Sequence, residues 1–148
     1  MQITNPWVQE CVHISYDIYN ELGAGYSETV YHKAFETALR LKNIRYQSEV
    51  ITPIFYKGFN VGHGRIDLMI NNQVIVELKA ISNFNNDTAN IQIKNYLKHY
   101  NLSEGLIVNF GQQNRSTLNI KYINPENKVY TLIDGHFIDQ SATEMVIN

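Results

Sequence analysis

Residues 65–79 read RIDLMINNQVIVELK, two short apolar runs with an Asn-rich tripeptide at 71–73 between them. Each run has the length and the branched apolar residues of a β-strand, and the tripeptide predicts a tight turn. If the loop is these three residues, the cross-strand pairs are Ile70–Val74, Leu68–Val76 and Ile66–Leu78. This register places the apolar side chains on one face of a hairpin, with two exceptions, Met69 and Ile75. Since a half-buried hairpin needs such a face, the pattern supports the register.

The same register places charged side chains on the opposite face of the hairpin. Asp67 lies across from Glu77, with a Cβ separation of about 4.5–5.5 Å, and Arg65 lies across from Lys79. Two carboxylates at this distance repel each other unless a cation lies between them or one is protonated. Oxygen ligands at this spacing suit Mg2+ or Mn2+. Lys79 adds a positive charge where a phosphate or an attacking water would lie.

The composition fits a globular chain of moderate size. Its 148 residues are 44% hydrophobic and 18% charged, which predicts one domain over residues 1–148, with a small β tail from about 118. The single cysteine, Cys11, excludes an internal disulfide framework and favours an intracellular location, cytoplasmic or nuclear. No apolar run approaches the roughly 18 residues that span a bilayer, and no secretory signal is expected. The net charge of −2 excludes a globally basic surface, so nucleic-acid binding would need a local patch.

Three helices are predicted around the hairpin. Asn5-Pro6 has the residues of a helix start, and Gly23 is a plausible helix end. Ser27 is expected to cap a second helix running to about Asn43. Its predicted core stripe is Val30, Ala34, Ala38 and Leu41. A third helix is expected after a cap at Asp87 or Thr88, with a stripe of Ile93, Tyr96, Leu97 and Tyr100.

Further strands are predicted on both sides of the hairpin. Residues 45–56 form a strand pattern in which Pro53 indicates a sheet edge or a bulge. Leu106–Phe110 is a short apolar run typical of a buried strand. Weaker strands are expected at 118–123 and 128–133, with a hairpin turn at Asp134-Gly135. This order of elements predicts an α/β domain whose mixed sheet is covered by helices.

Three short motifs point to a known family. Residues Gly25–Tyr31 read GYSETVY and match a GxxExxY signature. With Asp67, with Glu77-Leu78-Lys79 and with the later Asn109-Phe110-Gly111, the chain resembles the GxxExxY protein family. That family is placed in the PD-(D/E)XK nuclease-like superfamily. The resemblance spans roughly Val8–Gly111 and implies a PD-(D/E)XK nuclease-like core, a mixed central β-sheet flanked by helices.

The resemblance also implies which residues form a metal site. In such nucleases a carboxylate from an early helix joins the Asp and Glu of the central hairpin around the metal. Glu28 lies where that helix carboxylate is expected. Asp67 matches the Asp of the PD element, and Glu77 and Lys79 match the ExK element. Ile66 stands where the superfamily's name has proline, a variable position that does not touch the metal.

The implied function is a nuclease dependent on Mg2+ or Mn2+ that hydrolyses phosphodiester bonds of DNA, with RNA as a second substrate class. The expected metal ligands are Glu28, Asp67, Glu77 and the carbonyl of Leu78. The expected catalytic residues are Glu28, Asp67, Glu77, Lys79 and Gln92. Gln92, with Tyr96 four residues on, matches a QxxxY pattern that often supports such a site. The candidate phosphate contacts near the site are Lys57, His63, Arg65, Lys94 and Lys98.

A second interpretation stays open, in which the chain is a catalytically silent module that binds nucleic acid or protein. Glu28 could merely complement the N-terminal end of its helix. Asp67 and Glu77 could form exposed cross-strand ion pairs with Arg65 and Lys79. The tyrosine-rich surface could support a homodimer. Four of the histidines show no ligand spacing that indicates a metal: His13, His32, His99 and His136.

Overall fold

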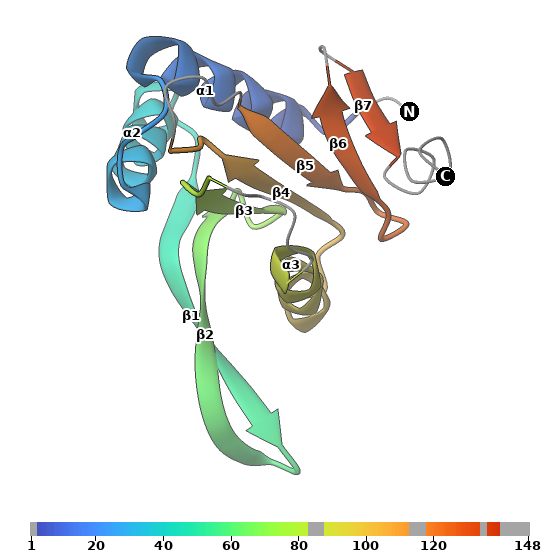
Figure 1. Ribbon diagram of the computed structural model, residues 1–148. Coiled ribbons are helices and arrows are strands. Elements are labelled where there is room, and N and C mark those ends of the chain that lie inside the picture. Colours follow the sequence, from blue (N-terminus) through green and yellow to red (C-terminus); the bar gives the residue numbers. More distant parts are fainter. Residues whose placement is uncertain (1–2, 83–87, 113–117, 134–135, 140–148) are drawn as a thin grey trace.

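A computed structural model describes residues 3–82, 88–112, 118–133 and 136–139 of the chain (Figure 1). The helices are α1 (Pro6–Leu22), α2 (Glu28–Leu41) and α3 (Thr88–His99). The strands are β1 (Tyr46–Tyr56), β2 (Phe59–Ile70), β3 (Val74–Lys79), β4 (Glu104–Asn109), β5 (Asn119–Ile123), β6 (Val129–Ile133) and β7 (His136–Asp139). The predicted order of elements is therefore confirmed. The predicted turn at Asp134-Gly135 and the cap at Asp87 lie outside the described residues.

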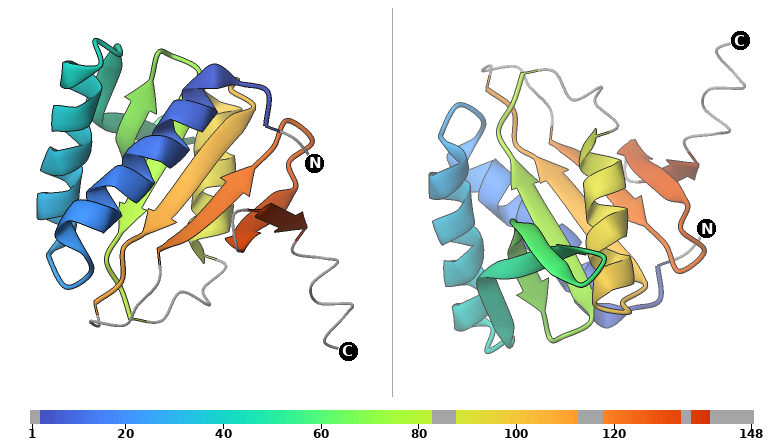
Figure 2. Two further views of the ribbon diagram at one scale, coloured as in Figure 1. Left: turned by 90° about the horizontal axis from the view of Figure 1, so that it is seen from above. Right: turned by 90° about the horizontal axis from the view of Figure 1, so that it is seen from below.

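The seven strands form one mixed sheet in the order β1-β2-β3-β4-β5-β6-β7. Only β3 and β4 run parallel, and α3 lies between them in the chain; every other neighbouring pair is antiparallel. Helices α1 and α2 cover one face of the sheet, and α3 covers the other (Figure 2). This is the predicted α/β fold, with a mixed central sheet flanked by helices. Strands β5 to β7 extend the same sheet; that residues 1–148 form one domain stays a prediction.

Strand β3 is buried on both of its faces, as expected for a strand in the middle of a covered sheet. Its even-numbered residues Val74, Val76 and Leu78 contact the core layer under α1 and α2. Ile75 contacts the layer under α3, together with Ile93. The two predicted exceptions on the hairpin, Met69 and Ile75, thus belong to the second core layer.

The first helix begins and ends as its sequence predicts. The Asn5 Oδ1 atom accepts a hydrogen bond from the Trp7 amide at 2.9 Å, and Pro6 occupies the first helical position. Gly23 ends the helix with a φ of 71°, in the left-handed region that glycine adopts at little cost. Among the described residues, no helix has both the length and the apolar content needed to cross a membrane.

The predicted core stripe of α2 is right in its middle and wrong at its ends, because Ala34 and Ala38 are half-buried against the core. Val30 and Leu41 are 38% and 80% exposed, whereas the buried residues are Tyr31, Phe35 and Leu39. Both sets have helical spacing, so periodicity alone could not separate them. These larger side chains face the core because they fill more of the space between α2 and the sheet.

The β2–β3 hairpin has the predicted three-residue loop and the predicted register near it. Ile70 pairs with Val74 and Leu68 with Val76, and the pairing ends there. The predicted position of Ile66 is wrong: it packs with Met69 and Ile75 in the layer under α3. Regular alternation would place Ile66 beside Leu68, so the alternation of β2 breaks at Asp67.

The break in β2 has a counterpart in β1. The paired residues Ser48–Leu68 and Val50–Ile66 flank Glu49 and Asp67, which lie outside the regular pairing. Glu49 has a φ of 54°, an unusual conformation for a residue with a side chain. At Asp67, β2 therefore departs from regular pairing with both of its neighbouring strands, β1 and β3.

Beyond this break, β1 and β2 continue as a curved two-stranded arm that leaves the rest of the sheet (Figure 1). Lys57 and Gly58 make the two-residue turn at its tip, with φ values of 49° and 82°. β1 is an edge strand, the location that Pro53 predicted, because proline has no amide to donate within a sheet.

Candidate functional site

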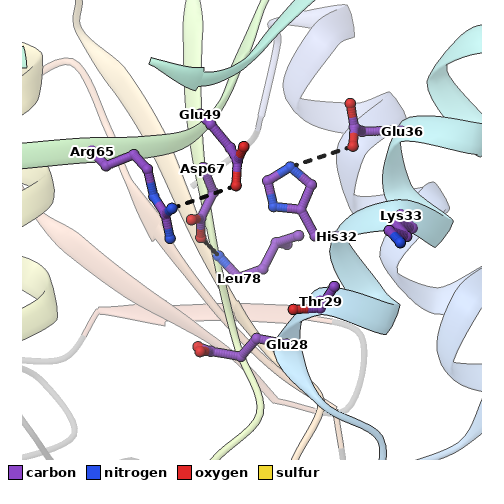
Figure 3. Close-up of a pocket in the computed structure, with 9 residues that line it drawn as sticks. All are labelled: Glu28, Thr29, His32, Lys33, Glu36, Glu49, Arg65, Asp67 and Leu78. Carbon is purple, nitrogen blue, oxygen red and sulfur yellow. Dashed lines mark hydrogen bonds and ion pairs between the residues drawn. The ribbon is translucent and has the colours of Figure 1, made fainter. Parts of the chain in front are cut away.

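A cavity of about 230 Å3 opens between α2 and the irregular part of the sheet (Figure 3). Its walls come from the outer face of α2 and from strands β1, β2 and β3. The lining residues are Glu28, Thr29, His32, Lys33, Glu36, Glu49, Arg65, Asp67 and Leu78. Most of these side chains are charged or polar, so the cavity suits an ionic ligand.

Asp67 and Glu77 lie where β2 and β3 stop pairing, and each carboxylate accepts a hydrogen bond from a main-chain amide of the other strand. The Leu78 amide donates a hydrogen bond to Asp67 Oδ2 at 2.7 Å. The Asp67 amide donates to Glu77 Oε1 at 3.3 Å. Two acidic side chains thus replace the regular ladder at the place where the strands separate. This arrangement keeps both carboxyl groups at the junction of the strands.

The environment of Glu77 favours its protonated form. Glu77 is only 6% exposed. Burial, followed by the negative charge of Asp67, raises the pKa of Glu77 from 4.5 to about 8, while Lys79 acts in the opposite direction. A divalent cation beside both groups would relieve this repulsion, so the oxygen donors present fit such an ion.

The raised pKa predicts how stability changes with pH in protein treated with EDTA. Because the folded-state pKa of about 8 exceeds the usual 4.5, the native state binds more protons between these values. The free energy of unfolding should therefore fall as pH rises from 4.5 to 8. Glu77→Gln should remove this fall and stabilise the protein at pH 9 by at most about 5 kcal/mol.

Urea unfolding of wild type and Glu77→Gln at pH 5 and pH 9 measures this effect. Glu126→Gln is the matched control, because Glu126 is an exposed carboxylate paired with Lys128 at 3.7 Å. The control should keep the wild-type pH dependence. Parallel pH curves for wild type and Glu77→Gln would contradict the raised pKa.

Glu28 is the first residue of α2, and its exposed side chain lines the same cavity as Asp67. Figure 3 shows its carboxylate pointing from the helix toward the sheet, on the side where Leu78 and Asp67 lie. Ser27 occupies the predicted N-cap position before Glu28, but its side chain makes no capping hydrogen bond. Its negative charge at the helix N-terminus is favourable in itself.

The glycine and tyrosine of the GYSETVY motif hold the loop in front of Glu28. The Tyr31 hydroxyl donates to the Gly23 carbonyl at 2.5 Å and accepts from the Tyr26 amide at 3.3 Å. The Gly25 amide donates to the Gly111 carbonyl at 3.3 Å, with Gly25 at a φ of 106°. The motif therefore fixes where α2 begins, which positions the Glu28 carboxylate.

The Asn109-Phe110-Gly111 motif joins this loop to the end of β3. The Phe110 ring stacks on Tyr31, with centroids 4.1 Å apart. Buried Asn109 accepts from the Ile81 amide at 3.0 Å and donates to the Ile81 carbonyl at 3.1 Å. The Phe110 amide donates to the Lys79 carbonyl at 2.9 Å. The three sequence motifs thus form one connected structure around the cavity and β3.

Lys79 and Gln92 lie on the α3 side of this junction. Lys79 is half-buried at the end of β3, where its charge favours the ionised form of Glu77. Gln92 is exposed on α3, and its Nε2 atom donates to the Tyr96 hydroxyl at 3.3 Å. Burial and the charge of Glu77 raise the pKa of Tyr96. Gln92 therefore contacts Tyr96, and the charge of Glu77 acts on the Tyr96 hydroxyl.

The predicted cationic contacts are divided among three places. Arg65 lines the cavity and pairs with Glu49 at 3.5 Å. His63 is exposed on the arm, and Lys57 lies at the arm's tip, away from Asp67. Lys94 and Lys98 line a second cavity of about 390 Å3 between α3 and the β5–β6 turn. Of the five predicted contacts, only Arg65 lines the cavity of Asp67.

The structure adds His32 and Glu49 to the candidate site. The His32 Nε2 atom lies 2.7 Å from Ser48 Oγ and 3.6 Å from Glu36 Oε2. The sequence did carry a signal for His32, because it is four residues from Glu28 and four from Glu36, on one helix face. Glu49 gave no such signal, since its position depends on the irregularity between β1 and β2.

Within the described part of the chain, no three His, Cys, Asp or Glu side chains come close enough together to hold one metal ion. Glu28 and Asp67 share the cavity, and Glu77 lies beside Asp67 without lining that cavity. The expected ligands are thus neighbours that this conformation does not gather around one point.

Comparisons with known proteins identify a matching family and similar solved structures. The sequence profile of the PD-(D/E)XK nuclease superfamily matches residues 5–122. No curated protein matches the chain. A solved structure titled "Crystal structure of SSO0001" is similar at 20% identity and a TM-score of 0.49, covering 65% of this chain and 48% of that protein. The chain therefore spans about half the length of that protein.

Proposed function

Because this chain belongs to the PD-(D/E)XK nuclease superfamily, we propose that it is a metal-dependent nuclease that hydrolyses phosphodiester bonds of DNA, with RNA as a second substrate class. The observation that carries the proposal is the carboxylate pair at the β2–β3 junction. Asp67 and Glu77 are joined through the Asp67 amide, and Glu77 is held at a raised pKa. A buried carboxyl group with a strongly raised pKa, close to a polar cavity, is typical of catalytic sites.

Mg2+ or Mn2+ is the proposed cofactor, since nucleases of this superfamily generally use divalent metals. The residues that would hold it are Asp67, Glu77, Glu28 and the carbonyl of Leu78. When bound, the ion lowers the pKa of a water molecule and offsets negative charge on the reacting phosphate.

The other proposed roles belong to residues around the pair. Lys79 would orient the attacking water or stabilise charge that develops on the phosphate. Arg65, at the cavity wall, is positioned to contact a substrate phosphate. Gln92 donates a hydrogen bond to the Tyr96 hydroxyl and so helps to hold this side chain in place. Tyr96 packs closely against β2: a Cβ atom added at Gly64 would come within 3 Å of the Tyr96 ring. We expect the protein to act inside the cell, where its buried free thiol, Cys11, stays reduced.

A silent binding module is the second candidate. The observation that favours it is the separation of the three carboxylates, because Glu77 does not line the cavity of Glu28 and Asp67. Such a module would still bind nucleic acid or protein through the cavity and its surroundings.

Cleavage of labelled single- and double-stranded DNA and RNA tests the proposal. Cleavage is expected with Mn2+ or Mg2+ and none with EDTA. Ca2+ should raise nucleic-acid affinity above its value in EDTA, because the ion screens the carboxylates from phosphate. Added salt should weaken the complex, since phosphate contacts release counterions. Equal affinity in Ca2+ and EDTA would count against a metal site, and binding without cleavage of any substrate would favour the silent module.

A further inference from the structure

The β1–β2 arm exposes an unusual amount of apolar surface. Six large hydrophobic side chains between residues 51 and 61 are 49% to 75% exposed: Ile51, Ile54, Phe55, Tyr56, Phe59 and Val61. Large apolar side chains this exposed are common one at a time on a protein surface, but six of them on one short element are unusual. A surface of this kind on an extended element indicates a contact with a ligand.

The arm also differs in charge from the rest of the chain. The whole chain has 14 acidic and 12 basic residues, yet residues 50–66 contain no Asp or Glu. They do contain Lys57, His63 and Arg65. The Lys57 Nζ atom lies 5.4 Å from the centre of the Tyr56 ring. The arm is therefore a locally cationic, aromatic surface on an acidic protein.

This combination favours a polyanion with aromatic bases over a second copy of the chain. Proteins that bind single-stranded nucleic acid combine cations for the backbone with aromatic side chains on which bases stack. In an arm-to-arm dimer the same cations would face each other, which is unfavourable. Paired bases in a duplex are already stacked and would leave the exposed rings of the arm uncovered.

The arm is continuous with the candidate site. Arg65 lines the cavity of Asp67, and it pairs across the arm with Ile51. At about 3.3 Å per residue, the eight residues from Asp67 to Phe59 span about 26 Å. A single strand of nucleic acid with one phosphate at Asp67 could therefore follow the arm for several nucleotides.

We propose that the β1–β2 arm is a stacking surface for unpaired bases, so that the substrate is a single strand or the unpaired part of a duplex. The inference rests on the proposed function. Phe55, Tyr56 and Phe59 supply the stacking rings, and Lys57, His63 and Arg65 supply the phosphate contacts.

Binding of a labelled oligo-dT and of a duplex of equal length, both in Ca2+, tests the arm. A triple variant, Phe55→Ser with Tyr56→Ser and Phe59→Ser, should bind the single strand at least about tenfold more weakly. Its duplex affinity should change less than about twofold. Leu41→Ser is the matched control, because Leu41 is a large hydrophobic residue that is 80% exposed at the end of α2. It should bind both ligands like wild type, and melting temperatures check that all variants fold.

A fluorescence reporter tests stacking directly. The chain has a single tryptophan, Trp7, so Trp7→Phe combined with Phe59→Trp places the only indole at the arm's tip. Oligo-dT should quench its emission, and the duplex should quench it less. Emission that does not respond to oligo-dT under binding conditions would overturn the proposal.

The outcomes separate this inference from the proposed function. If the triple variant binds and cleaves single strands like wild type while Asp67→Ala does not cleave, the arm inference fails and the nuclease proposal stands. If the wild type neither binds nor cleaves any nucleic acid, both fail. If the wild type sediments as a dimer and the triple variant as a monomer, with nucleic-acid binding unchanged, the arm contacts a second copy of the chain and the inference is overturned.

Discussion

Asp67→Ala should abolish metal-dependent cleavage, with a loss of turnover of about a thousandfold or more, because it removes a carboxylate that the proposed ion and the strand junction share. Asp67 lies beside Glu77 and accepts the Leu78 amide at 2.7 Å, so it is held in place at the junction. Metal affinity should fall together with turnover. Titration calorimetry with Mn2+ and a gel assay with labelled DNA measure the two losses.

Asp67→Asn distinguishes the role of the Asp67 charge in metal binding from the contribution of its hydrogen bond to stability. Alanine leaves the buried Leu78 amide without its acceptor, at a cost of about 1–3 kcal/mol, whereas the asparagine amide oxygen can still accept that hydrogen bond. Asparagine should therefore restore stability but not metal affinity or cleavage. Cleavage that persists unchanged in Asp67→Ala would mean that a contaminant is responsible.

The hairpin around Asp67 could be predicted because its signals are local. Alternation and an Asn-rich turn define the register near the loop, and Asn71 and Asn72 adopt the positive φ values of 50° and 55° that asparagine tolerates. The position of Ile66 could not be predicted. It depends on the break at Glu49 and Asp67, where a neighbouring strand and two carboxylates override the alternation.

The error in α2 has a similar cause. Val30 and Leu41 are apolar and lie at helical spacing, so they predict a buried face as well as Phe35 and Leu39 do. Contacts with residues outside the helix determine which face of α2 is buried. Tyr31 stacks on Phe110 from another part of the chain, and its hydroxyl bonds to the loop before α2, which fixes the rotation of the helix.

The candidate site was predictable in its centre and unpredictable at its edges. Asp67 and Glu77 are close because they lie on adjacent strands of one hairpin, which the sequence shows. Glu49 reaches the cavity only through the docking of β1, and Lys57 is carried away from it by the arm. The distances of Glu49 and Lys57 from the carboxylate pair thus depend on how the strands pack in three dimensions, which short sequence motifs do not show.

Lys79→Ala should reduce turnover about a hundredfold or more while nucleic-acid affinity in Ca2+ changes less than about threefold. The lysine is half-buried next to Glu77, and its charge lowers the pKa of that carboxyl group. An ammonium in this place acts mainly on charge that develops in the transition state, so its loss should affect kcat more than binding. Lys42→Ala is the control, since Lys42 is paired with Glu10 at 3.7 Å on the surface of the helices.

Two further measurements decide how Lys79 acts. If it acts only by keeping Glu77 ionised, its removal raises the pKa of Glu77, and the variant should recover activity as pH rises above 8. If it acts on the transition state, the loss persists at every pH, which is the expected result. Lys79→Arg keeps the charge but not the compact donor geometry, so it should not rescue turnover. An equal loss of affinity and turnover in Lys79→Ala would contradict the proposed role, because it would make Lys79 a contact for the substrate rather than for the reaction.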